Sequence, residues 1–163
     1  MQVTRADVAA EYEWIRERAT TVVPIANDVR DRLADAFDVA VDDVTVDQYE
    51  TAIDETFEDG ARAVNVATLS LLLRSLDVDD DYPGFVVDEL LGRELAATIA
   101  GNQPLRMLAE ATFHYADVYT HTDGTAGLDD LDAALAAGVQ TRVPGWGWTE
   151  SDPFGVVDSE EKR

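Results

Sequence analysis

The fold is decided by the stretch TRADVAAEYEWIRERATTVVPIANDVRDRL, residues 4–33. Its apolar residues recur at alternating spacings of four and three, which is the heptad pattern of a helix that packs along one seam. Thr4 followed by Asp7 is typical of a capping box, so we expect the helix to begin there. The seam consists of Val8, Tyr12, Ile15, Ala19, Val22, Ala26, Val29 and Leu33.

One proline, Pro24, interrupts this stretch and lies off the seam. The apolar spacing continues unchanged across the proline, which favours a single helix over two unrelated ones. We therefore predict one long N-terminal helix, kinked at Pro24 with the proline on its outer side.

Further helices are predicted wherever apolar periodicity lies between start and stop signals. Apolar residues surround the helix expected over 60–76, which indicates a central, buried element. The last helix is expected over 128–137, ending at Gly138. The prediction is an all-α bundle of five or six helices over residues 1–143, followed by an irregular, extended tail over 144–163. The other predicted helices begin at Thr45, after Pro83-Gly84, and at Pro104.

Acidic residues outnumber basic ones by 34 to 12, and eleven of the twelve basic residues are Arg. Because 46% of the residues are hydrophobic and the acids are interleaved with them, we expect a globular chain despite its net charge of −22. The excess of Asp, the near-absence of Lys and the abundance of Ala and Val resemble the composition of cytosolic proteins from salt-accumulating haloarchaea. That resemblance identifies no family. It implies a cytoplasmic protein that works in concentrated salt.

The composition also argues against several classes of function. Nucleic-acid phosphates are bound by patches of Lys and Arg, which the sequence lacks, and no apolar run is long enough to cross a bilayer. A protein mimic of nucleic acid needs its charge on one face, whereas here every segment is acidic. The absence of cysteine removes thiolate metal sites. We therefore expect neither nucleic acid nor membrane as a direct partner.

Both histidines, His114 and His121, lie seven residues apart in the helix that begins near Pro104. With Glu110 and Asp117 they fall within about 60° of one another on that helix and form one stripe. Histidine with carboxylate is a ligand set for Zn, Fe or Mn, and histidine beside aspartate also suits a general base. These four residues are the candidate site for a divalent metal.

The opposite side of the same helix supports a different interpretation. Its apolar residues centre almost opposite the histidine stripe, so amphipathicity alone predicts that the stripe faces solvent. A metal site would then require the stripe to face a second helix, a cleft or a neighbouring subunit. The residues on the apolar side are Leu105, Leu108, Thr112, Tyr115, Ala116 and Tyr119.

Two other segments carry weaker signals. In the segment 77–81, alternate aspartates match the first ligand positions of an EF-hand, but Tyr82 stands where that loop needs glycine. The tail segment PGWGW, residues 144–148, places Trp146 and Trp148 beside glycines. Tryptophans in such a tail suit either an interface with another chain or a cap over the end of the core.

These patterns favour a non-catalytic helical interaction or regulatory module. We expect it to associate with itself, through the long first helix or the tryptophan tail, or with another protein. The alternative is a metal-binding protein or a metal-assisted hydrolase that uses Glu110, His114, Asp117 and His121.

Overall fold

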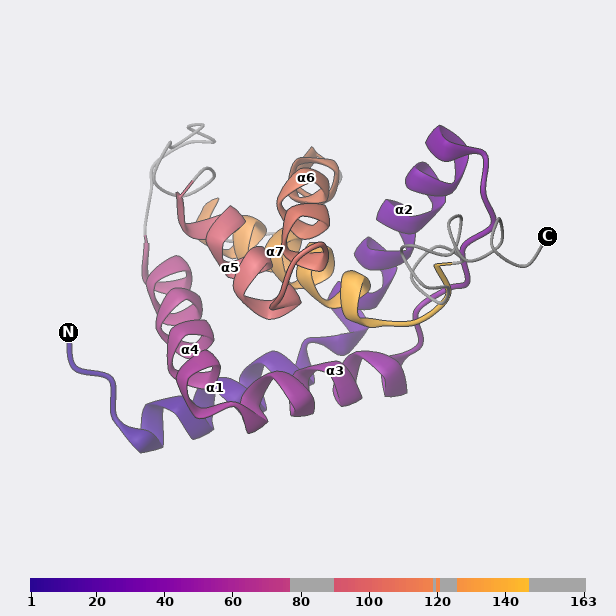
Figure 1. The fold of residues 1–163 in the computed structure, drawn as a ribbon. Helices are drawn as coiled ribbons and strands as arrows, with labels where there is room; N and C mark the ends of the chain where they lie inside the picture. Colours follow the sequence, from indigo (N-terminus) through magenta and orange to yellow (C-terminus); the bar gives the residue numbers. More distant parts are fainter. Residues whose placement is uncertain (77–89, 119, 121–125, 147–163) are drawn as a thin grey trace.

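The computed structural model describes residues 1–76, 90–118, 120 and 126–146, and over these ranges the chain is built of α-helices (Figure 1). Seven α-helices and one isolated β-bridge lie in this described part. The predicted all-α class is therefore confirmed. The predicted count of five or six is too low, because the stretch expected to form one long helix forms two. None of the helices in these ranges is long and apolar enough to span a bilayer.

The N-terminal stretch forms α1, Arg5–Glu17, and α2, Ala19–Phe37, which meet at a bend at Arg18. Pro24 lies inside α2 on its exposed side, as predicted, and the break between the two helices falls six residues earlier, at Arg18. An unbroken helix from Arg5 to Phe37 would extend about 50 Å, against about 30 Å for the diameter of a small domain. The bend lets both halves of the seam reach one core (Figure 1).

The seam itself is buried on both sides of the bend, as the heptad pattern predicts. The Tyr49 hydroxyl donates a hydrogen bond of 2.6 Å to the Ile15 carbonyl, which ties the last turn of α1 to α3, Val46–Glu58. Burial raises the pKa of this phenol, so it stays a donor. Two seam residues of α1, Val8 and Tyr12, are half-buried, and the buried ones are Ile15, Ala19, Val22, Ala26, Val29 and Leu33.

Capping boxes open two helices where the sequence predicts them. In the box of α1, the Thr4 side chain accepts from the Asp7 amide and the Asp7 carboxylate accepts from the Thr4 amide. Thr45 and Gln48 make the same reciprocal pair at the start of α3, Val46–Glu58. Each box satisfies two amides that a helix start otherwise leaves without partners.

Three more helices follow α3 before the last one. They are α4, Gly60–Ser75, α5, Arg93–Ala100, and α6, Leu105–Val118. A π-helical turn over 90–92 leads into α5. The segment with alternate aspartates, 77–81, lies outside the described residues.

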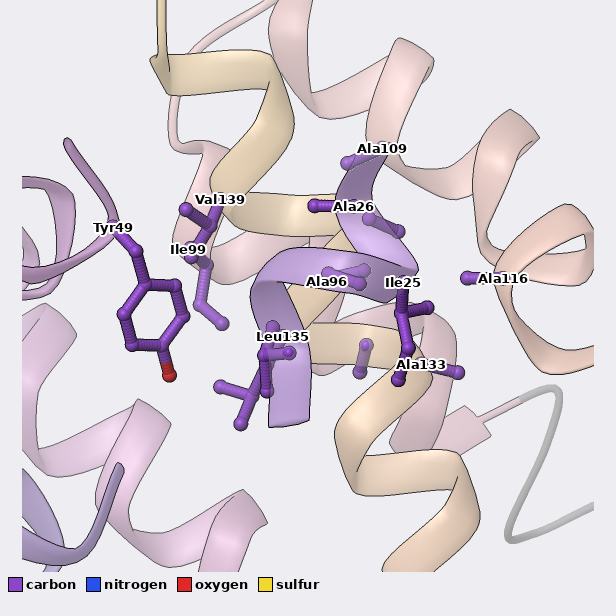
Figure 2. Close-up of a cluster of buried hydrophobic side chains, with 14 of the residues drawn as sticks. Ile25, Ala26, Tyr49, Ala96, Ile99, Ala109, Ala116, Ala133, Leu135 and Val139 are labelled. Atoms are coloured by element: carbon purple, nitrogen blue, oxygen red, sulfur yellow. The ribbon is translucent and has the colours of Figure 1, made fainter. Parts of the chain in front are cut away.

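The last helix, α7, Ala126–Arg142, is the centre of the molecule. It contacts α2, α3, α4, α5 and α6, and every side chain from Asp130 to Thr141 is buried. The prediction that the helix over 60–76 is central is wrong, since Val64 of α4 is 46% exposed. Figure 2 shows alanines from several helices gathered around Leu135 and Val139 of α7.

Glycine explains how α7 can be surrounded so closely. The sequence predicted that Gly138 ends the helix. Instead, Gly138 lies inside α7 and packs against α5. A Cβ atom placed there would lie 2.8 Å from the Ala96 carbonyl oxygen and 2.8 Å from the Ile99 Cβ. At Gly127 an added Cβ would lie 2.0 Å from the Leu73 carbonyl oxygen of α4. Only glycine permits these two backbone approaches.

The described chain ends by folding back on the core. Trp146 forms an antiparallel bridge with Val41 in the loop after α2, and its side chain is 1% exposed. The first residues of the segment expected to be a separate tail, 144–146, thus pack on their own domain. Trp148 lies outside the described residues.

Candidate functional site

The outer face of α6 carries a row of exposed, mainly apolar side chains. Met107 and Val118 are each 63% exposed and Tyr115 is 42% exposed. Ala111 and His114, which lie between them on the helix, are exposed as well. We call these five residues the α6 face. Figure 1 shows α6 on the side of the molecule away from α1 and α3.

The opposite side of α6 is built into the core. Ala109, Thr112, Phe113 and Ala116 are buried where the helix packs on α2, α5 and α7. The prediction that the core side lies opposite His114 is therefore confirmed. Tyr115 is an exception, because its ring was expected on the core side and is instead part of the α6 face.

The metal stripe predicted from the sequence lies along one edge of the α6 face. His114 is exposed, with its ring centroid 5.5 Å from that of Phe113, while Glu110 and Asp117 are half-buried. His121 lies outside the described residues. Within the described ranges, no group of three or more His, Asp or Glu side chains comes close enough to hold a metal ion. The four-residue site stays a prediction.

Another charged cluster, which the sequence interpretation missed, lies between α1, α4 and α7. Glu11 is 2% exposed, and its carboxylate accepts from the Ser70 hydroxyl at 2.7 Å and pairs with the Arg74 guanidinium at 2.8 Å. The guanidinium of Arg74 stacks over the Trp14 ring at 4.0 Å from its centroid. A hydrogen-bonded, paired carboxylate of this kind can be buried without leaving an uncompensated charge.

The Trp14 ring also has Arg18 over it, at 4.9 Å. Arg18 donates two hydrogen bonds of 2.7 Å each to the fully buried carboxylate of Asp132. Burial raises the pKa of Asp132, and the Arg18 hydrogen bonds oppose that rise. The sequence carries no local signal for this pair, because Asp132 is one of three aspartates within four positions at the start of α7, with Asp129 and Asp130.

A third buried charge, Arg30, closes the C-terminal end of α7. Its guanidinium donates to the carbonyls of Gln140 at 2.8 Å and Val143 at 2.6 Å. It also donates to the carbonyls of Asp42 at 2.6 Å and Pro144 at 3.0 Å. Burial lowers the pKa of Arg30 to about 10, so the side chain remains charged at neutral pH.

These contacts show what the scarce basic residues do. Six arginines in the described part of the chain each join two helices, or a helix and a loop. Their guanidinium groups are held by carboxylates or main-chain carbonyls. The fork of a guanidinium suits this use better than an ammonium group. Glu11 and Asp132 are covered by their arginines, so they serve packing and not an open site. The joining arginines are Arg16, Arg18, Arg30, Arg74, Arg106 and Arg142.

Comparison with known proteins gives one match. A family model described as "Domain of unknown function (DUF7984)" matches residues 1–158. No curated protein and no solved structure matches the chain. The geometry of the described residues is therefore the basis for assigning a function.

Proposed function

The chain belongs to this family of unknown function, and we propose from its geometry that it is a non-catalytic interaction module. We propose further that its partner is a second copy of the same chain, docked on the α6 face. The observation that supports this proposal is the exposure of Met107, Tyr115 and Val118 along one side of a helix. A row of large apolar side chains in water gives up the free energy that burial would supply.

The heptad seam and Trp146, which the sequence suggested for self-association, are buried within the chain, while Trp148 lies outside the described residues. Helices α1 and α2, which carry the heptad seam, pack against α3, α4, α6 and α7. The Trp146 ring is buried as well, with its indole N–H donating to the Gln140 carbonyl at 3.3 Å. These buried groups are not available for pairing with another chain. Among the described residues, the α6 face is exposed and can pair.

The spacing within the α6 face suits pairing between two helices. Met107, Ala111, His114 and Val118 follow steps of four, three and four, which is the spacing of a heptad seam. A symmetric pair uses the same patch on both copies, so one face of this kind is sufficient.

Charge selects the direction in which the two helices run. Glu110 and Asp117 lie on one edge of the α6 face, and Tyr115 lies on the other. In an antiparallel pair the two acidic edges meet, which brings like charges together. In a parallel pair Glu110 of one copy faces Tyr115 of the other, where the phenol can donate to the carboxylate. We therefore propose a parallel pair.

The pairing is expected to be weak. Full burial of one large apolar side chain contributes about 1.5–3 kcal/mol. At exposures of 42% to 63%, the three large residues of two copies together contribute roughly 7 kcal/mol. Association costs about 4–15 kcal/mol in lost freedom. The dimer should therefore form and dissociate with protein concentration.

Sedimentation equilibrium in molar salt, over micromolar to millimolar protein, tests this proposal. We expect wild-type chain to pass from monomer to dimer, and Met107→Glu to stay monomeric because it places a charge in the seam. Phe37→Glu is the matched control, since Phe37 is 67% exposed at the end of α2, outside the α6 face. A wild-type chain that is monomeric throughout, or a Met107→Glu chain that dimerises as wild type does, would contradict the proposal.

A further inference from the structure

Resting on the pairing proposed above, we infer that the dimer holds one divalent transition-metal cation between its two copies. The ligands are His114 of each copy, with carboxylates from Glu110 or Asp117 beside them. The site is thus completed by the second chain. Its cation links the two copies and sets how tightly they associate.

His114 occupies a central position on the α6 face. His114 stands in the seam itself, between Ala111 and Val118, and not on the solvent side of the α6 face. Seam residues of a parallel symmetric pair face their own copies across the twofold axis. The two imidazoles are therefore brought together, and the small Ala111 one turn away leaves room for a ligand beside them.

Symmetry then supplies the ligands that a single chain lacks. Glu110 is four residues before His114 and Asp117 is three residues after it, so both are its neighbours on one edge of α6. Within one chain, the described residues bring no three such groups within reach of one ion. Two copies double the set to two imidazoles and four carboxylates, more than the four ligands of a closed tetrahedral site.

The ligand chemistry determines which cation the site takes. Two imidazoles with carboxylates favour zinc, cobalt or nickel, whereas magnesium and calcium prefer oxygen alone. Such a cation also offsets the negative charge of Glu110 and Asp117 in both copies. Because the cation binds the dimer and not the separated chains, it strengthens association by mass action.

The test compares dimer dissociation constants by sedimentation equilibrium, in EDTA, in zinc and in magnesium at matched ionic strength. We expect zinc to tighten the wild-type dimer by about tenfold or more, with one zinc per two chains, and magnesium to leave it unchanged. His114→Leu places an apolar side chain in the seam and removes the imidazole. The variant should therefore dimerise in EDTA, and zinc should not lower its dimer dissociation constant. This variant therefore distinguishes the effect of the cation on dimerisation from the effect of the apolar seam.

The other outcomes are distinct. Dimers that form in EDTA and ignore zinc would overturn the cation site and leave the proposed function standing. One zinc per chain, lost in His121→Ala, would replace the shared site with a site in one chain. Chains that are monomeric in every condition would overturn both proposals.

Discussion

Arg30 shows how much of this fold depends on one side chain. Its four acceptors are main-chain carbonyls, three of which come from the end of α7 and the residues that follow it. A cation at a helix C-terminus is stabilised by the helix dipole, and the carbonyls there have no amide partners of their own. The Trp146 ring lies 5.4 Å from the same guanidinium. One residue therefore fixes α2, the loop after it and the end of α7.

Substitution of Arg30 should be strongly destabilising. Arg30→Met leaves buried carbonyls without donors, and Arg30→Lys keeps the charge but loses the planar fork. We expect each to lower the free energy of unfolding by about 3–5 kcal/mol. Arg32→Met, at an exposed position on the same helix, should change it by at most about 1 kcal/mol, the contribution of an exposed charge. Chemical denaturation in one buffer measures all three, and an Arg30→Met chain as stable as wild type would contradict the assigned role.

At the scale of the elements, helix starts were predictable and helix positions were not. Thr4 with Asp7 and Thr45 with Gln48 mark their helices because capping depends on residues three apart in the sequence. The bend at Arg18 is not marked, since both halves of the seam keep the same spacing and bury the same side. A periodic pattern indicates which face is buried, and a long-range fit decides where the chain turns.

The central position of α7 was missed for a related reason. Hydrophobicity favours α4, which is rich in leucine, whereas α7 owes its place to small size: Ala133, Ala134, Ala136, Ala137 and Gly138 let other helices approach. The partners of the buried charges were equally out of reach. Arg18 and Asp132 are separated by 114 residues, and nothing local in the sequence connects them. His114 lies on the exposed side of α6, as its position on the helix predicted, but the large apolar residues beside it were not recognised as an exposed row.

Close packing of α5 on α7 gives a prediction for Gly138→Ala. Alanine is the better helix former by about 1 kcal/mol, yet the new methyl group meets main-chain and Cβ atoms at 2.8 Å. Overpacking of this kind costs about 1–3 kcal/mol, and rigid partners put it at the upper end, so the variant should be less stable than wild type. Gly60→Ala is the matched control, because an added Cβ there meets nothing within 4 Å. If Gly138→Ala is as stable as wild type or more stable in thermal unfolding, the prediction is contradicted and α5 must shift to make room for the methyl group.

For the whole molecule, the balance of charge predicts a dependence on salt. A net charge of −22 opposes compaction, and salt reduces the Debye length from about 10 Å at 0.1 M to about 3 Å at 1 M. Surface pairs such as Arg16 with Glu50 weaken in salt, but each contributes at most about 1 kcal/mol. Screening of the net charge should prevail. We expect the free energy of unfolding to rise between dilute and molar potassium chloride, and equal values at both would contradict this expectation.

The place of α7 in the chain has a consequence for synthesis. Among the described residues, α7 follows the other helices along the chain and packs against α2 to α6. During synthesis, the earlier helices leave the ribosome before α7. The apolar sides that pack against α7 therefore stay uncovered until α7 has been made. Folding is therefore expected to be completed only once α7 has been synthesised, because the contacts of this central helix join distant parts of the chain. Until α7 is in place, the exposed apolar sides of the earlier helices can form wrong contacts, so folding depends on preventing those contacts.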